Sequence, residues 1–344
     1  MPTKEYKKIL ILQPDHIGDV LLATPMVRAI RQRFPEAKID IVVGSWAKDI
    51  VEHNPDIDNI YVFNFRQFNR GRVSNLEKWP NFIKIRSNHY DLAVMARSRN
   101  RLIRFFARTA GIPARIGFEV PGKDANLTIK VKQADLKEHV ILRNLRIAEA
   151  LGADISKPEL VLIPSQAAEK KAQDILQDRL RPFIGVNPAA GTEAKQWPAE
   201  RFNDTTRRLS EKYGGTIFVV GGPRDVNLAK EVAKNVPGEV VILAGKTSLT
   251  ELAALTAKFD LCISNDSGPM HIAATMKCPV IDLHSGTDYP SMWRPWGNEH
   301  TVLTHAEDCD KLPCFKTECD YFDHGCLELI TVKDVIEAAD KYLG

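Results

Sequence analysis

One stretch decides how this chain folds: Ile263-Ser264-Asn265-Asp266-Ser267-Gly268-Pro269-Met270-His271-Ile272-Ala273-Ala274. Its apolar beginning predicts a buried strand, and the small residues after Pro269 predict a helix. A proline suits the first helical position, because its missing N–H would be unpaired there. Such helix starts bind anions, and open α/β sheets bind ligands at the carboxyl ends of their strands. The stretch therefore predicts a phosphate site, although Asp266 and Ser267 would equally serve as ordinary helix caps.

The same order of strand, loop and helix recurs along the chain. Apolar runs predict strands at 8–13, 39–43, 60–63, 92–96, 183–187, 216–220, 240–243, 261–264 and 280–284. Helical spacing of apolar residues predicts helices at 20–34, 47–53, 101–110, 139–151, 167–180, 199–213, 226–235, 249–259, 270–277 and 331–343. Strands that alternate with helices predict an α/β fold with parallel sheets covered on both faces.

Two domains are expected, because 344 residues exceed the usual size of one. The pattern weakens at 152–166, where Pro, Ser and Asp accumulate, and then begins again. We therefore predict two Rossmann-like domains, 1–160 and 161–325, whose sheets face a central cleft. The helix in 326–344 is expected to pack back on the N-terminal domain, with the second half as the other choice.

The charge of the chain is unevenly distributed. Residues 66–115 contain twelve Lys or Arg against two acids, whereas the whole chain carries a net charge of +3. Such a segment attracts nucleic acid, anionic lipid or an acidic sugar, or it is simply a solvated face. No apolar run reaches the roughly 20 residues of a membrane span, and the N-terminus lacks a signal-peptide cleavage site, so a soluble, cytoplasmic protein is expected.

The loop after the first predicted strand is Gln13-Pro14-Asp15-His16-Ile17-Gly18-Asp19-Val20. It lacks the G-x-G-x-x-G pattern of dinucleotide sites, which argues against NAD binding. Gly18 suits a turn that other residues resist. Asp19 lies at a predicted helix start, where it is either an ordinary cap or a general base.

Two loops of the second half carry charged side chains. The first, 187–198, places Lys195 among small residues, where it is either a solvated lysine or a point charge for phosphate oxygens. The second, Gly221-Gly222-Pro223-Arg224-Asp225, places an acid near a helix start. That position suits a ribose hydroxyl in nucleotide-binding folds, and it equally suits a plain turn.

Six cysteines fall into two groups. Cys262 and Cys278 lie in apolar strand-like contexts, which predicts small core residues. The other four share one loop region: Cys309, Cys314, Cys319 and Cys326. Their spacing differs from the C-x₂-C pairs of zinc sites, so free thiols are expected rather than a metal site or disulfides.

Together these motifs resemble the ADP-heptose family of bacterial lipopolysaccharide heptosyltransferases, which have the GT-B fold. The segments that carry the resemblance are ILILQPDHIGDVLLATPMVRAIRQRFP from Ile9, ARIGF from Ala114, NPAAGTEAKQWPAERF from Asn187, GGPRD, NDSGPMHIAAT from Asn265 and the CFKTEC and HGCL tail. Each segment is short, but their order and spacing cover nearly the whole chain.

The resemblance implies a role for each predicted site residue. Asp19 would deprotonate the acceptor hydroxyl, Lys195 would hold donor phosphate, and Asp225 would face the ribose. The remaining donor residues would be Thr192, Asp266, Ser267, Gly268 and His271. Residues 1–160 would then bind the acceptor, through Gly18, Arg97, Arg99 and Arg101, and residues 161–325 the donor. Ala190-Gly191 stand where the family's paired hydroxyl residues are expected, which leaves Thr192 as the nearby hydroxyl.

The predicted reaction is inverting transfer of heptose from ADP-heptose to the acidic inner core of lipopolysaccharide, at the inner face of the inner membrane. No cofactor is expected, and no metal either, because the donor loop carries no D-x-D pattern. Nucleic acid is not an expected partner. The alternatives are a GT-B nucleotide-sugar 2-epimerase, a transferase of another nucleotide sugar and a non-catalytic polyanion binder. The core position, the heptose epimer and the oligomeric state stay open.

Overall fold

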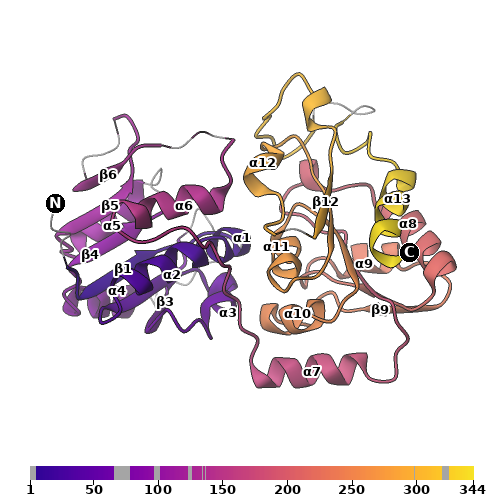
Figure 1. Cartoon of the computed structure of the whole chain (residues 1–344), viewed down its shortest axis with the longest axis horizontal. Coiled ribbons are helices and arrows are strands. Elements are labelled where there is room, and N and C mark those ends of the chain that lie inside the picture. The colour runs from indigo at the N-terminus through magenta and orange to yellow at the C-terminus, as the bar shows by residue number, and fades with distance from the viewer. Residues whose placement is uncertain are drawn as a thin grey trace. The chain divides into compact units, whose positions relative to one another are not determined.

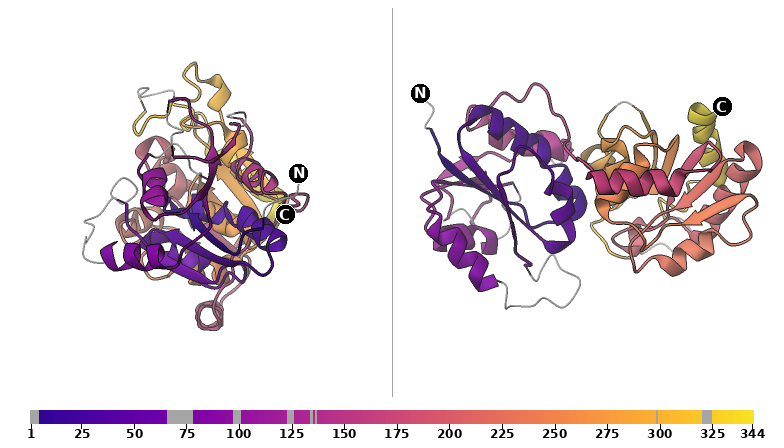
Figure 2. Two further views of the ribbon diagram at one scale, coloured as in Figure 1. Left: turned by 90° about the vertical axis from the view of Figure 1, so that its left-hand side faces the viewer. Right: turned by 90° about the horizontal axis from the view of Figure 1, so that it is seen from below.

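The computed structural model describes residues 5–65, 78–96, 101–122, 126–133, 135, 137–297, 299–319 and 325–344. The chain forms two compact units, Met1–Val161 and Leu162–Gly344. Each contains a six-stranded parallel sheet with helices on both faces (Figures 1 and 2). The predicted α/β class with two parallel sheets is confirmed. The units divide one residue beyond the boundary expected from the sequence, within a segment that has neither helix nor strand.

The first sheet has the strand order β3-β2-β1-β4-β5-β6. Its strands are β1 (Lys8–Leu12), β2 (Lys38–Val43), β3 (Asn59–Val62), β4 (Leu92–Met95), β5 (Ala114–Phe118) and β6 (Ile129–Val131). The order reverses beside β1, so the loop after β1 lies at a switch point of the sheet, where such folds bind ligands. The sequence pattern does not predict β5 and β6, because both are short and are interrupted by Arg115, Gly117 and Lys130.

Helices cover both faces of this sheet. They are α1 (Ile17–Leu21), α2 (Thr24–Arg33), the 3₁₀ turn η1 (Ser45–Ala47), α3 (Lys48–Val51), α4 (Lys78–Ser87), α5 (Arg101–Thr109) and α6 (Val140–Glu149). Leu10 and Leu12 of β1 pack with Ile85 of α4 and Phe106 of α5 in one core. Both α4 and α5 pack on this one face of the sheet, and each leaves its outer side exposed to solvent.

The single helix expected at 20–34 is wrong, because the structure has α1 and α2 with a break at Leu22 and Ala23. Pro25 has no N–H with which to bond the carbonyl of Leu21 four residues earlier. The Thr24 hydroxyl donates to that carbonyl instead, at 2.7 Å. A short separate helix therefore carries Asp19.

The second sheet has the order β12-β11-β10-β7-β8-β9. Its strands are β7 (Phe183–Asn187), β8 (Thr216–Val219), β9 (Glu239–Ile242), β10 (Leu261–Asn265), β11 (Val280–Leu283) and β12 (His300–Leu303). The order reverses beside β7, which pairs with both β8 and β10. The carboxyl ends of β7 and β10 therefore form the switch point of this unit.

Two groups of helices cover this sheet (Figure 1). The group of α8 (Ala199–Tyr213), α9 (Val226–Val232) and α13 (Val332–Leu343) packs on one face. The group of α7 (Gln166–Leu176), α10 (Leu249–Thr256) and α11 (Gly268–Thr275) covers the other. Short turns η2 (Glu193–Lys195), α12 (Pro290–Trp293) and η3 (Ala306–Asp308) lie in the loops.

The placement of the last helix corrects one expectation. We expected it to pack back on the N-terminal domain, but α13 contacts α8, β10, β11 and β12 of its own unit. Val335 and Ala339 are fully buried in the core of that unit, and their spacing of four places both on one helix face. Within the described residues, no helix combines the length and the apolar character that crossing a bilayer requires.

Candidate active site

The switch point of the second sheet joins the loops that follow β7 and β10. Asn187 and Ser264 are register partners at the ends of these strands. The Asn187 side chain donates to the Ser264 hydroxyl and to the Ser267 hydroxyl, each at 2.8 Å. Asn265 fastens the same two loops, because its Oδ1 accepts from the backbone N–H of Trp197 at 3.1 Å. These hydrogen bonds therefore join the two predicted donor-site segments, the loops after β7 and β10, into one local structure.

Lys195 lies at the centre of this structure, in the turn η2. Its Nζ donates to Asp266 Oδ2 at 2.6 Å and to Asp288 Oδ2 at 3.2 Å. The Lys195 side chain is only 20% exposed, so the alternative of an ordinary solvated lysine is wrong. Burial lowers the pKa of Lys195, but the two carboxylates outweigh burial and raise the pKa above its usual range. The site therefore holds a permanent cation.

The start of α11 differs from the predicted cap. The helix begins at Gly268, so Pro269 occupies the second helical position. Ser267 is at the N-cap, but its side chain makes no cap hydrogen bond and instead accepts from Asn187. Asp266 pairs with Lys195. The capping alternative is therefore wrong for both side chains, and the first-turn N–H groups of α11 are not covered by Ser267, which suits anion binding.

His271 and Thr192 lie beside these residues. His271 is buried in α11, and its charge helps to lower the pKa of Asp266, after the larger contributions of Lys195 and His284. Thr192 starts the turn η2, where its carbonyl accepts from the backbone N–H of Lys195 at 3.1 Å. In the part of the chain that the structure describes, the buried Thr192 hydroxyl has no hydrogen-bond partner. A ligand oxygen would supply one.

Asp225 closes the turn after β8. Its Oδ2 accepts from the backbone N–H of Gly222 at 2.7 Å. A Cβ at Gly221 would lie 3.0 Å from the Asp225 Cβ, so the turn leaves little room for a side chain there. The structure thus shows the plain turn role of Asp225. Contact with a ribose stays a prediction.

Three charged residues in β11 or just after it lie at this site without having been predicted there. Asp288 is the second partner of Lys195. His284 Nδ1 lies 2.9 Å from Asp282 Oδ2, and its Nε2 lies 4.0 Å from Asp266 Oδ2. The sequence VIDLH could have indicated this pair, because it places an acid among apolar residues. Acids are almost never fully buried unless they are paired.

Burial and neighbouring charges both shift the pKa values of Asp282 and His284. Burial raises the pKa of Asp282. Burial lowers the pKa of His284, but Asp282 and Asp266 outweigh it and raise that pKa. The two acids therefore favour the protonated form of His284 against the effect of burial.

This pair predicts a pH dependence of stability. Because the folded-state pKa of His284 is raised, its contribution is present below the unfolded value of 6.5 and is lost as the pH rises through the folded value. The melting temperature of the wild type should fall as the pH rises from neutral to alkaline values. The substitution His284→Asn should make this fall smaller. Thermal unfolding of both proteins from neutral to alkaline pH measures the difference. His305→Asn is the matched control, since His305 pairs with Asp308 on the surface, and an equal flattening there would contradict the prediction.

The first unit contains the predicted base. Asp19 lies in the first turn of α1, is 9% exposed, and its carbonyl accepts from the Gln13 side chain at 3.4 Å. Gly18 is helical rather than in a special turn conformation, so its predicted conformational role is wrong. Arg101 is the exposed first residue of α5. Arg97 and Arg99 lie outside the described residues.

The cysteines follow the predicted division. Cys262 and Cys278 are buried. Cys326 Sγ accepts from the backbone N–H of Gly286 at 2.9 Å, and the N–H of Cys314 donates to the Gly286 carbonyl at 3.1 Å. All six are free thiols, and no group of metal-ligating side chains occurs among residues that the structure describes. The segments that contain Cys314 and Cys326 are thus hydrogen-bonded to the loop that carries Asp288.

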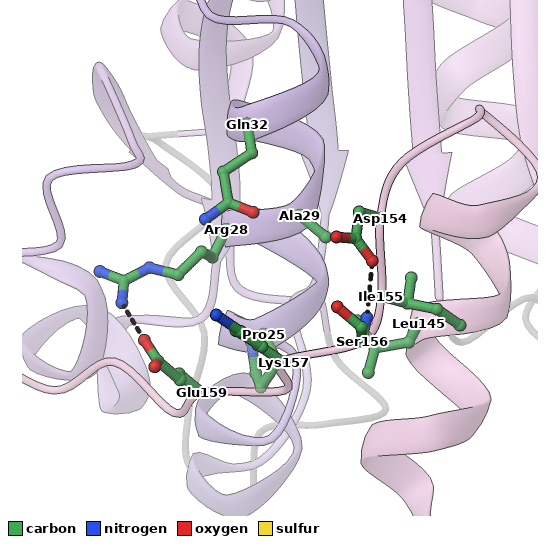
Figure 3. Close-up of a pocket in the computed structure, with 10 residues that line it drawn as sticks. All are labelled: Pro25, Arg28, Ala29, Gln32, Leu145, Asp154, Ile155, Ser156, Lys157 and Glu159. Carbon is green, nitrogen blue, oxygen red and sulfur yellow. Dashed lines mark hydrogen bonds and ion pairs between the residues drawn. The ribbon is translucent and has the colours of Figure 1, made fainter.

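A small pocket of about 100 Å³ lies elsewhere in the first unit (Figure 3). Arg28 lines it and pairs with Asp56 at 3.0 Å and with Glu159 at 3.1 Å. Ser156 donates its N–H to Asp154 at 2.9 Å on the opposite wall. None of the predicted site residues lines this pocket.

The geometry can be compared with known proteins. Residues 82–323 match the model of glycosyltransferase family 9 (heptosyltransferase). The chain belongs to this family. Lipopolysaccharide heptosyltransferase 3 of Escherichia coli K12 is 30% identical over 338 residues, which cover 95% of each chain. The family assignment makes the protein a glycosyltransferase and confirms the resemblance that its motifs indicated.

Two solved structures of the family show the same fold. The glycosyltransferase family 9 protein of Veillonella parvula has a TM-score of 0.83 at 24% identity, over 99% of this chain and 98% of that one. The ADP-heptose lipopolysaccharide heptosyltransferase II of E. coli has a TM-score of 0.77 at 22% identity, over 98% of both chains. The GT-B architecture expected from the sequence is confirmed.

Proposed function

We propose that this family 9 glycosyltransferase transfers heptose from ADP-heptose to the inner core of lipopolysaccharide, with inversion at the anomeric carbon. One observation carries the donor half of the proposal: Lys195, Asp266 and the α11 start meet at the switch point of the second sheet. Two E. coli relatives support the choice of donor and acceptor: an ADP-heptose lipopolysaccharide heptosyltransferase and a lipopolysaccharide heptosyltransferase.

The reaction needs a base for the acceptor and charge stabilisation for the leaving group. In the proposed step, Asp19 takes the proton of the acceptor hydroxyl while that oxygen bonds to the anomeric carbon. The bond between that carbon and the donor phosphate breaks, and its electron pair leaves with ADP. Lys195 and the N–H groups at the α11 start stabilise the new negative charge. Asp225 would hold the ribose, and Thr192 would bond a phosphate oxygen.

The acceptor side rests on the basic part of the first unit. Gly18 lies in the same short helix as Asp19, and Arg101 begins α5. We assign these residues, together with Arg97 and Arg99, to the phosphate and carboxylate groups of the core saccharide. Opposite charge would raise the rate of acceptor capture and make that rate sensitive to salt.

We propose that transfer needs no metal, because a lysine and a helix start supply the positive charge that a divalent ion would otherwise supply. Calorimetric titration with ADP, UDP and GDP tests the donor site. We expect selective binding of ADP, with the same affinity when a chelator is present. Preference for UDP would support the 2-epimerase or a transferase of another nucleotide sugar. Loss of ADP binding on chelation would contradict metal independence.

A further inference from the structure

The helices α4 and α5 lie next to each other on one face of the first sheet. The rings of Phe82 and Phe106 meet edge to face with centroids 5.2 Å apart. At the carboxyl ends of the helices, Arg86 donates to the carbonyl of Thr109 at 2.7 Å. The two helices therefore run in the same direction and present one joint outer surface.

Large apolar side chains stand on this outer surface. Trp79 and Ile83 of α4 are 71% and 62% exposed, and their spacing of four places both on one helix face. Leu102 and Phe105 of α5 are 57% and 58% exposed, with a spacing of three. These four residues are called the α4–α5 face. Clustered exposed apolar side chains mark contacts with proteins or membranes, whereas single ones are ordinary.

The charged residues within the two helices of the α4–α5 face all have one sign. Neither helix contains Asp or Glu. Lys84, Arg86, Arg101 and Arg108 are exposed on the two helices. Tryptophan, phenylalanine and aliphatic side chains next to Lys and Arg are the combination that binds at the boundary of an anionic bilayer.

We infer that the α4–α5 face docks the enzyme on an anionic lipid bilayer. This inference deepens the proposed function and rests on it for the choice of partner, since a lipopolysaccharide acceptor is anchored in a membrane. The apolar side chains enter the headgroup region, and the cations pair with lipid phosphates. A second copy of the chain is a poorer occupant, because a symmetric contact would bring the same cations together.

Vesicle flotation with the full-length protein tests the docking surface. We expect binding to vesicles of phosphatidylethanolamine and phosphatidylglycerol, weaker binding in high salt, and little binding to phosphatidylcholine vesicles. The double variant Trp79→Ser, Phe105→Ser should lower partitioning to anionic vesicles about tenfold or more. Leu180→Ser is the matched control, because Leu180 is an exposed leucine of the second unit, at 74% exposure, outside this surface. The control should bind like wild type.

Turnover on a deacylated, water-soluble core saccharide separates docking from catalysis. The double variant should retain wild-type turnover on that acceptor and lose it on acceptor embedded in vesicles. Three results would overturn the inference: no vesicle binding by wild type, equal binding by the double variant, or light scattering that shows a wild-type dimer and a monomeric variant. Vesicle binding as expected, without any heptose transfer, would instead reject the proposed function and leave the docking surface standing.

Discussion

Asp19→Ala should nearly abolish transfer while donor binding stays intact. Loss of a general base lowers turnover by roughly 10² to 10⁴. The proposed base acts on the acceptor hydroxyl, so the affinity for ADP in the second unit should stay at its wild-type value. Initial rates with donor and acceptor measure the first effect, and calorimetric titration with ADP measures the second. Turnover close to wild type would remove Asp19 as the base.

The control for this experiment is Asp49→Ala. Asp19 and Asp49 each lie in the first turn of a short helix of the first unit. Each substitution removes one favourable interaction with a helix dipole, worth about 0.3 to 1 kcal/mol. Equal small losses of stability with unequal losses of activity would separate the chemical role of Asp19 from its helical one. Asp19→Asn should be as inactive as Asp19→Ala, because an amide cannot accept the proton.

Lys195→Ala should impair both donor binding and folding stability. Removing one partner of a buried ion pair costs about 3 to 5 kcal/mol, because the other charge stays buried. Here Asp266 would remain, with a side chain only 5% exposed. If Lys195 stabilises the leaving phosphate as proposed, loss of this cation should lower kcat/KM by roughly 10² to 10³. Denaturant unfolding and steady-state kinetics with varied donor measure the two effects.

The stability loss of Lys195→Ala should depend on pH. In the wild type, Lys195 is the largest of the groups that lower the pKa of Asp266 against burial. Asp266 therefore contributes stability above its unfolded value of 3.8, and this contribution is lost as the pH falls through the folded value. In the variant, this loss of stability on the acid side should move to higher pH. A variant that unfolds at the wild-type acid midpoint would contradict the pairing.

Two further variants separate folding from function at Lys195. Lys195→Ala combined with Asp266→Asn should regain part of the stability, because the unpaired carboxylate is gone, but it should regain no activity. Lys171→Ala is the surface control, since Lys171 pairs with Glu251 at 2.8 Å and is 43% exposed. Its loss should be at most about 1 kcal/mol, with activity unchanged. Activity regained in the double variant would rule out a role for Lys195 in phosphate binding.

Local signals in the sequence predicted most of the second unit. The helix at Ala199–Tyr213 and the strand at Phe183–Asn187 have the predicted bounds. Their apolar spacing is regular, and clear turn residues flank them. The strands β5, β6 and β12 are missing from the prediction. Short strands with few consecutive apolar residues carry little periodic signal, and their neighbours in the sheet supply the rest of their stability.

The sequence by itself determined the fold class, the family and which two loops are proposed to bind the donor. Alternating apolar runs predict parallel sheets, and the motifs are contiguous segments that need no structure to be read. Only the tertiary structure decided what these residues contact. Lys195 and Asp266 are 71 residues apart, and they meet because β7 and β10 are neighbours in register. Because of the same register, the side chains of Asp266 and Ser267 do not cap α11. The pairing of β11 with β10 buries Asp282 and His284 beside the site. Such contacts depend on strand order, which the spacing of residues along one chain does not encode.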